Sequence, residues 1–196
     1  ADDSELVRLM VDAGFEKVFV GIETPDEAAL VECHKVQNEG RDLVAAVKTL
    51  QHAGLQVQGG FIVGFDSDKP SIFQRQIEFI QQSGIVTAMV GLLQAPYGTR
   101  IYERMEKEGR LLGDLTGNNT DDTMNFQPKM DPEVLHDGYR RIVRTIYSPR
   151  EYYRRVRIFL QEYGKSHVVR PSLDLNYLWA LVRSMVVQGL GGKGRL

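Results

Sequence analysis

The sequence predicts an α/β fold in which short parallel strands alternate with helices. Three apolar runs rich in β-branched and aromatic residues lie within residues 17–94, and an apolar helical stripe precedes each run. Each of these helices ends in an Ala-Gly or Ser-Gly step. Strands that alternate with helices of this size form parallel βαβ units with right-handed crossovers, and this rhythm favours a barrel-like repeat over a sandwich.

The three strands are expected at residues 17–23, 57–65 and 87–94. Each run is short and lacks a regular alternation of apolar and polar residues, which is typical of strands buried on both faces. Each preceding helix ends near a glycine, the residue that most readily follows a last helical turn: Gly14, Gly54 and Gly84. Ser4 is expected to cap the first helix.

The alternation stops after residue 112. Residues 113–131 are rich in Gly, Asn and Asp, which predicts a long polar loop. Three amphipathic helices without strands are expected within residues 132–196. Within the loop, residues 121–126 are expected to lie on the surface, and contact with a substrate is the alternative.

Composition narrows the class of protein. With 42% hydrophobic residues, 26% charged residues and a net charge of −2, the chain resembles a globular protein, and we expect no nucleic-acid partner. The single cysteine, Cys33, excludes an internal disulfide and is expected to be an ordinary half-buried thiol. The four histidines share no ligand spacing, so no metal site is predicted. No signal peptide is visible, and a cytoplasmic location is expected.

Three strands cannot close a barrel, and they leave two edges that would pair with other strands. We therefore expect the sheet to be incomplete. Either the N-terminal half of the same polypeptide is missing and completes it, or two copies pair their edges in a homodimer.

Ligands of parallel α/β folds bind at the carboxyl ends of the strands. Glu23 ends the first strand, where its carboxylate can accept hydrogen bonds from ribose hydroxyls or from an ammonium group. The alternative is that Glu23 caps the short helix that begins near Pro25.

The second strand contains Gly60, Ile62 and Gly64, and glycines in a strand allow a flat ligand or another backbone to approach closely. Tight packing against a helix is the alternative, and Asp68 is expected to cap that helix. The turn is not a phosphate loop, because it lacks the Gly-Lys-Ser/Thr ending and its acidic residues would repel phosphate. At the end of the third strand, Gln94 precedes a Pro-Tyr-Gly-Thr turn, which a helix cap explains equally well.

The order and spacing of these segments are more specific than any one of them. The runs Val18-Phe19-Val20-Gly21-Ile22-Glu23-Thr24, Phe61-Ile62-Val63-Gly64-Phe65 and Pro96-Tyr97-Gly98-Thr99-Arg100-Ile101-Tyr102 together resemble the radical S-adenosylmethionine (SAM) superfamily. The resemblance points to the cobalamin-dependent subgroup, which includes the anaerobic magnesium-protoporphyrin monomethyl ester cyclase and hopanoid methylases. Over residues 5–110 it implies strands four to six, the C-terminal half of a (β/α)₆ partial TIM barrel, followed by an all-helical extension.

The resemblance also assigns cofactor-binding residues. It places Glu23 at the ribose or methionine end of SAM. Adenine would be lined by Gly60, Ile62 and Gly64 and would meet the turn formed by Gln94 and Ala95. The family usually carries Pro-Gly-Glu where this sequence has Asp66-Ser67-Asp68, which changes the expected cap.

The superfamily's Cys-x-x-x-Cys-x-x-Cys loop, which holds a four-iron–four-sulfur cluster, has no match here. The resemblance therefore implies that the cluster is bound by the missing N-terminal half, and resemblance to the cobalamin-dependent subgroup implies the same for cobalamin. It implies no catalytic residue in this chain and no activity of the chain alone. The complete enzyme would cleave SAM reductively to a 5′-deoxyadenosyl radical and act on a tetrapyrrole- or lipid-like small-molecule substrate, by methylation, cyclisation or another radical outcome.

Two other interpretations remain open. One is a non-catalytic α/β module that binds a nucleotide or a partner protein through its open edges. The other is a relative of the RNA methylthiotransferases, although those enzymes end in a small β-barrel rather than in helices.

Overall fold

The computed structural model describes residues 3–113, 123–164 and 175–190. These residues belong to two compact units, residues 1–166 and residues 167–196. The first unit holds the sheet and most of the helices, and the second holds the last helix of the chain.

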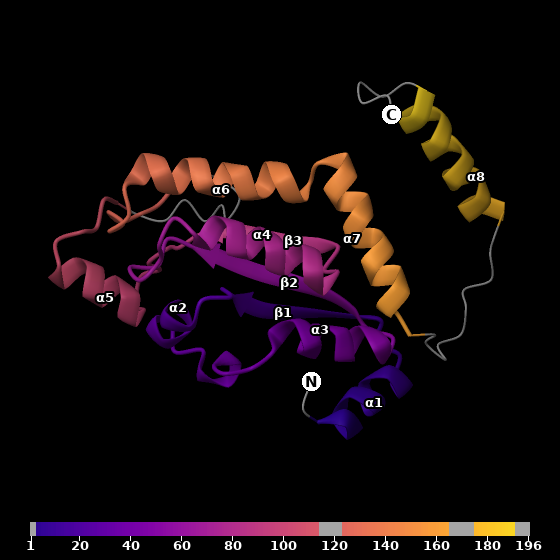
Figure 1. Cartoon of the computed structure of the whole chain (residues 1–196), viewed down its shortest axis with the longest axis horizontal. Helices are drawn as coiled ribbons and strands as arrows, with labels where there is room; N and C mark the ends of the chain where they lie inside the picture. Colours follow the sequence, from indigo (N-terminus) through magenta and orange to yellow (C-terminus); the bar gives the residue numbers. More distant parts are fainter. Residues whose placement is uncertain (1–2, 114–122, 165–174, 191–196) are drawn as a thin grey trace. The chain divides into compact units, whose positions relative to one another are not determined.

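A three-stranded parallel sheet forms the centre of the first unit (Figure 1). The strands lie side by side in the order in which they occur along the chain: β1 (Lys17–Glu23), β2 (Gln56–Val63) and β3 (Thr87–Leu92). In the register, Gly21 lies opposite Gly60, and Ile62 lies opposite Gly91. The α/β class and the parallel order predicted from the sequence are confirmed, and the second and third strands end two residues earlier than expected.

Helices connect the strands and follow them. In the first unit they are α1 (Ser4–Asp12), α2 (Glu27–Glu32), the 3₁₀ turn η1 (Val36–Asn38), α3 (Leu43–His52), α4 (Ile72–Ser83), α5 (Arg100–Lys107), α6 (Pro132–Ile146) and α7 (Pro149–Glu162). Asp3, not Ser4, caps α1, because its carboxylate accepts a hydrogen bond from the Leu6 N–H at 2.9 Å. Gly14 and Gly84 have positive φ angles of 89° and 71°, as expected of residues that follow a helix.

The two faces of the sheet differ, which corrects the prediction of strands buried on both faces. One face packs against α3, α4 and α6 and forms the core, with Val57, Phe61 and Val63 of β2 buried. On the other face Phe19 is 59% exposed and Met89 is 51% exposed. The prediction failed because glycines in the strands interrupt the alternation of apolar and polar residues that marks a half-covered sheet.

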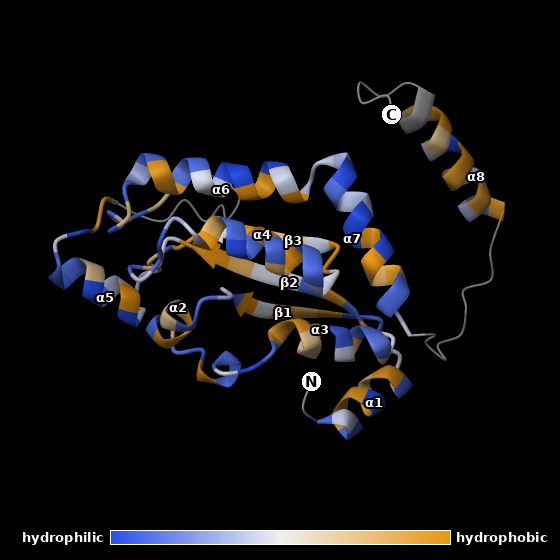
Figure 2. Cartoon of the chain, in the orientation of Figure 1, coloured by the Kyte–Doolittle hydropathy of each residue, from blue (hydrophilic) through white to orange (hydrophobic). Residues whose placement is uncertain are grey.

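Helices α6 and α7 pack against α4, and α6 also lies beside β3. Figure 2 shows that α4, α6 and α7 carry both hydrophobic and hydrophilic residues, as amphipathic helices do. The Tyr147 hydroxyl donates a hydrogen bond to the Ala88 carbonyl at 2.8 Å and so satisfies a backbone group of β3. The predicted boundary at residues 113–131 stays a prediction, although α6 and α7 belong to the same compact unit as the sheet.

Part of the described end of the predicted loop is buried rather than on the surface. Residues 114–122 lie outside the described residues, and with them Asp121 and Asp122 of the expected surface loop. Phe126 is fully buried and forms an antiparallel bridge with Leu111, while Asn125 is 6% exposed. These residues lie at the carboxyl end of the sheet, packed with Leu93 and Ala95.

The second unit contains α8 (Leu175–Ser184), which continues into a helical turn, η2 (Met185–Leu190). Most of its residues are hydrophobic (Figure 2), and Trp179 is 65% exposed. Within the part of the chain that the structure describes, no helix combines the length and the apolar character needed to cross a bilayer.

Candidate functional site

A groove of about 610 Å³ is lined by residues of the open face of the sheet, by both sides of the edge strand β3, and by residues of α6 and its end. It includes residues at the carboxyl ends of the strands. Four of the six residues predicted to bind a cofactor line it: Glu23, Gly60, Ile62 and Gln94. Glu23, the last residue of β1, and Gln94, which follows β3, belong to the two outer strands of the sheet. Both line one groove at the carboxyl ends of the strands, as the predicted convergence of the strand ends requires.

The floor of the groove is bare backbone over part of its area. Gly21 and Gly60 lie opposite each other on neighbouring strands, and Gly91 lies opposite Ile62 on the next strand. A Cβ atom added at Gly60 would lie 3.0 Å from the ring of Phe19. The absence of side chains at these positions lets a flat group lie against the sheet.

Glu23 sits at an irregular point of β1. Its φ angle is 67°, a left-handed conformation that is uncommon for a residue other than glycine, and the register of β1 with β2 shifts between Gly21 and Glu23. The side chain folds back over Gly21, so that a Cβ atom added at Gly21 would lie 2.5 Å from the Glu23 Oε1. Unusual backbone conformations of this kind cluster at functional sites.

The carboxylate of Glu23 forms an ion pair with Lys35, whose Nζ lies 3.0 Å from Oε1. Lys35 also donates to the Gly21 carbonyl at 3.4 Å. Both side chains are partly exposed, at 18% for Glu23 and 30% for Lys35. The alternative that Glu23 caps the next helix is wrong, because Asp26 caps α2 with hydrogen bonds from the Ala28 and Ala29 N–H groups.

Ala95 does not line the groove. It is fully buried, and the Asn125 carboxamide accepts a hydrogen bond from its N–H at 2.9 Å and donates one to its carbonyl at 2.7 Å. Gln94 makes the reciprocal contact, since its Oε1 accepts a hydrogen bond from the Asn125 N–H at 3.2 Å. The backbone of Ala95, which the resemblance assigns to adenine, is thus bonded to Asn125 in this structure.

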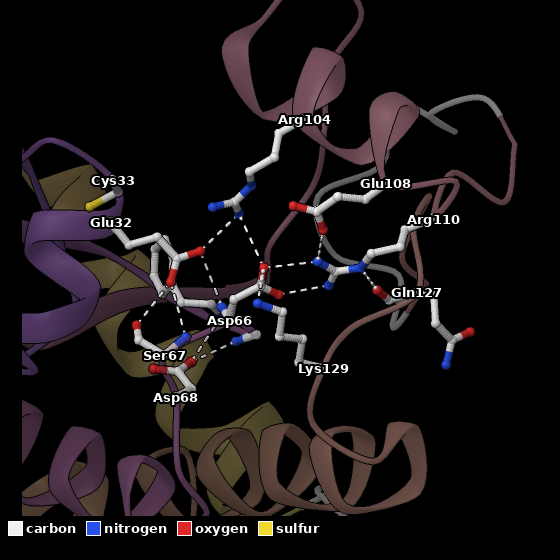
Figure 3. A network of polar contacts seen from close by, with 12 residues as sticks. Glu32, Cys33, Asp66, Ser67, Asp68, Arg104, Glu108, Arg110, Gln127 and Lys129 are labelled. Atoms are coloured by element: carbon white, nitrogen blue, oxygen red, sulfur yellow. Dashed lines mark hydrogen bonds and ion pairs between the residues drawn. The ribbon is translucent and has the colours of Figure 1, made fainter.

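Gly64 also lies outside the groove, at the turn that follows β2. Its φ angle is 105°, and a Cβ atom added there would lie 3.3 Å from Leu135. Asp68 does not cap α4 as predicted: its Oδ2 accepts hydrogen bonds from the N–H groups of Gly64 and Phe65 at 2.8 and 3.1 Å (Figure 3). Ser71 stands at the capping position of α4 without a side-chain cap bond.

The surroundings of Asp68 disfavour its ionised form. Burial, despite the two backbone hydrogen bonds, raises the pKa of Asp68 to about 7, and the negative charges of Asp26 and Glu32 act in the same direction. Its second oxygen, Oδ1, is buried and has no hydrogen-bond partner among the described residues. Burial likewise raises the pKa of Cys33, the half-buried thiol expected from the sequence.

Sequence reasoning assigned no role to two features at the groove. One is Lys35, which lies twelve positions after Glu23 in sequence and meets it because the chain returns to β1 after α2. The other is an aromatic and aliphatic stripe on α6 formed by Tyr139, Val143 and Tyr147. Their spacing of four residues places them on one face of α6, and a helical stripe was expected there, but the sequence gives no sign that it lines a groove.

The groove can bind a molecule that combines three kinds of surface. Glu23 and Lys35 offer a carboxylate and an ammonium group within 3.0 Å of each other, the glycines offer a flat floor, and α6 offers an apolar wall. The described residues contain no group of three or more His, Cys, Asp or Glu side chains arranged to hold a metal ion.

Known proteins share sequence with this chain. Residues 99–196 match a family described as domain of unknown function DUF4070. A protein of Synechocystis sp. named uncharacterized methyltransferase is 39% identical over 163 residues, which cover 82% of this chain and 30% of that protein. The hopanoid C-2 methylase of Rhodopseudomonas palustris is 40% identical over 110 residues, covering 56% of this chain and 21% of the methylase.

A bacteriochlorophyllide d C-12(1)-methyltransferase of Chlorobaculum tepidum is 28% identical over 144 residues, covering 74% of this chain and 31% of the relative. The chain thus spans about a third or less of the length of these curated relatives. All three are named as methyltransferases or methylases, which fits the radical SAM superfamily that the sequence resembles. The family match covers half of the chain, and the chain belongs to the DUF4070 family.

Proposed function

We propose that this chain forms the SAM-binding C-terminal half of a radical SAM methyltransferase, with β1, β2 and β3 as strands four to six of a (β/α)₆ partial barrel. The observation that carries the proposal is the Glu23–Lys35 ion pair at one end of a glycine-floored groove. The parallel order of the strands and the open face of the sheet support the partial barrel, since the interior of such a barrel is lined by one face of its strands.

The ion pair matches the charges of the amino-acid part of SAM. This part carries an ammonium and a carboxylate on one carbon atom, and in this proposal Glu23 binds the ammonium and Lys35 binds the carboxylate. Each ligand group replaces half of an existing ion pair, so neither protein charge is left without a partner when the ligand is bound. The adenosyl part then lies against the glycine floor beside Ile62 and Gln94.

The relatives favour methyl transfer among the outcomes that the sequence left open. One of them is named for a hopanoid and one for a bacteriochlorophyllide, and we propose a large, mostly apolar substrate for the complete enzyme. The wall formed by Tyr139, Val143 and Tyr147 supports this substrate class, because such side chains bind apolar surfaces. None of the three relatives is named for RNA, which disfavours the methylthiotransferase alternative.

The residues of this chain do not fit an iron–sulfur cluster. The chain has one cysteine, and three thiolates of the superfamily's loop are needed to hold the cluster that supplies the electron for SAM cleavage. We propose that residues preceding this segment in the same polypeptide supply that loop and, as in the cobalamin-dependent subgroup, a cobalamin site. We propose a cytoplasmic location for the complete enzyme. This chain covers about a third or less of each relative, which supports the rest of the same polypeptide, rather than a second copy in an edge-strand homodimer, as the partner of the sheet.

A binding comparison tests the proposed function directly. Isothermal titration calorimetry would compare SAM and S-adenosylhomocysteine with 5′-methylthioadenosine, which has the adenosyl part but lacks the amino-acid charges. We expect the first two ligands to bind about tenfold or more tightly than the third, as hydrogen bonds to charged groups provide. Glu23→Gln and Lys35→Met should remove this preference while leaving the affinity for 5′-methylthioadenosine unchanged.

Lys48→Met is the matched control, because Lys48 forms an ion pair of similar length, 2.8 Å to Glu162, away from the groove. A preference for SAM that survives both groove variants would refute the role given to the ion pair. ATP tests the alternative of a nucleotide-binding module: tighter binding of ATP than of SAM would favour that alternative. Methylated product formed anaerobically by the complete protein then tests the reaction.

A further inference from the structure

The turn between β2 and α4 is held by carboxylates that lie outside the groove. Four consecutive backbone N–H groups, those of residues 64–67, donate hydrogen bonds to two carboxylates. Asp68 accepts the first two, and Glu32 accepts those of Asp66 and Ser67 at 3.2 and 3.0 Å. Because each of these four N–H groups has a carboxylate acceptor, the position of residues 64–67 depends on these two side chains.

Glu32 lies at the end of α2 and contacts the turn from a different part of the sequence (Figure 3). Its carboxylate is 13% exposed and accepts two further hydrogen bonds, from the Ser67 hydroxyl at 2.9 Å and from Arg104 at 2.9 Å. Burial alone would raise the pKa of Glu32, but the hydrogen bonds from Arg104 and Ser67 lower it below its ordinary value. The carboxylate is therefore ionised at neutral pH and accepts all four bonds.

The same turn is tied to the segment that matches the DUF4070 family. Asp66 is 8% exposed and binds Arg110 through two hydrogen bonds, of 2.6 and 2.8 Å, with Arg104 and Lys129 each 3.5 Å from its Oδ2. Arg110 also donates to the Gln127 carbonyl at 2.8 Å. Figure 3 shows these side chains and Glu32 converging from the turn, from α5, from the chain after α5 and from α2.

The turn begins two residues after Ile62, which lines the groove on the adenosyl side of the proposed site. We propose that Glu32 is a positioning residue for this site: it fixes the turn after β2, and through the turn it fixes the end of β2 at Ile62, beside which the adenosyl group lies. This role rests on the proposed function. Glu32 does not line the groove, so any effect on affinity is transmitted through the backbone of residues 64–67.

The variant Glu32→Gln tests this role, with Glu162→Gln as the matched control. Glu162 is also an ion-paired glutamate of a helix, 23% exposed and bonded to Lys48 at 2.8 Å, and it does not line the groove. In Glu32→Gln, an NH₂ group replaces one carboxylate oxygen and cannot accept the hydrogen bonds that the turn and Arg104 donate to it. We expect faster hydrogen exchange at the Asp66 and Ser67 amides, and an affinity for SAM that is about 2- to 30-fold weaker, the range found for residues without ligand contact.

The ligand comparison separates this role from the role of Glu23. Glu32→Gln should weaken SAM and 5′-methylthioadenosine by the same factor, because both carry the adenosyl group, whereas Glu23→Gln should weaken SAM alone. Unchanged exchange at the two amides, or unchanged affinity for both ligands, would overturn the role of Glu32. A loss of the same size in Glu162→Gln would show a general effect of destabilisation and would overturn it too. If the unmodified chain binds neither ligand, the proposed function fails, and the exchange measurement still decides whether Glu32 holds the turn.

Discussion

Two adjacent glycines of β2 allow the groove and the core to be perturbed separately. Gly60 lies in the groove, and Gly59 lies on the covered face of the sheet. A Cβ atom at Gly60 would lie 3.0 Å from the ring of Phe19, which is 59% exposed and can move into solvent. At Gly59 it would lie 2.7 Å from the ring of Phe61 and 3.1 Å from Ile85, both of which are buried.

The two substitutions to alanine should therefore have opposite consequences. For Gly59→Ala, overpacking costs about 1–3 kcal/mol, and each kcal/mol lowers the Tm of a chain of this size by about 2–4 °C. For Gly60→Ala, replacing a glycine within a strand stabilises the folded chain by about 0.5–1 kcal/mol, which offsets the small cost of moving Phe19. The added methyl group instead lifts a flat ligand off the floor, which should weaken SAM binding about 10- to 200-fold, the effect of one methylene group in a pocket.

Thermal unfolding and SAM titration of both variants measure the two effects on the same samples. Gly59→Ala should lower Tm and leave the affinity of the folded fraction within about twofold of the unmodified chain. Gly60→Ala should leave Tm unchanged or slightly raised and lose affinity. A Gly60→Ala variant that binds SAM normally would refute the assignment of the glycine floor to the ligand.

Three further substitutions test the packing and the electrostatics. Gly138→Ala places a Cβ atom 2.3 Å from the buried ring of Phe73, so urea unfolding should show a loss of about 1–3 kcal/mol despite the better helix propensity of alanine. The fully buried Arg155 donates hydrogen bonds to the Val86 and Ile146 carbonyls, so Arg155→Met should lower the free energy of unfolding by about 1–3 kcal/mol for each acceptor left without a donor. Arg155→Lys should recover part of this loss, and unchanged stability of Arg155→Met would contradict this account. The pKa of Asp68 is raised to about 7 in the folded chain, so protonation of Asp68 stabilises the fold. This stabilisation is complete below the pKa of the unfolded chain and is lost as pH rises through about 7. The Tm of the unmodified chain should therefore gain a contribution from Asp68 between pH 8 and pH 5, and the Tm of Asp68→Asn should lack it.

Much of the fold follows from local patterns in the sequence. The predicted strand at residues 17–23 is observed with the same bounds, because its β-branched residues are flanked by a helix-ending glycine and a polar turn. The convergence of Glu23, Gly60, Ile62 and Gln94 on one groove also follows from sequence, since the ends of adjacent parallel strands must meet at one edge.

The remainder depends on contacts between distant residues. Glu32 lies 34 positions from Asp66, and no local signal distinguishes it from a solvated acid on a short helix. Asp68 has the position and the residue type of a helix cap, yet its carboxyl group accepts hydrogen bonds from the Gly64 and Phe65 N–H groups, while Glu32 accepts those of Asp66 and Ser67. Such alternatives have similar local energies, and tertiary packing decides between them.

The distribution of charge around the groove distinguishes between adenosine ligands. Nucleotides such as ATP carry their charge as phosphate, which usually binds to free N–H groups in a turn after a strand. Here the N–H groups of residues 64–67 already bond to the carboxyl groups of Asp68 and Glu32, and the ionised Glu32 would repel phosphate. SAM carries no phosphate, and its ammonium and carboxylate would lie at the far end of the ligand, where Glu23 and Lys35 form their ion pair. The arrangement of charge therefore favours SAM over ATP, independently of the resemblance in sequence.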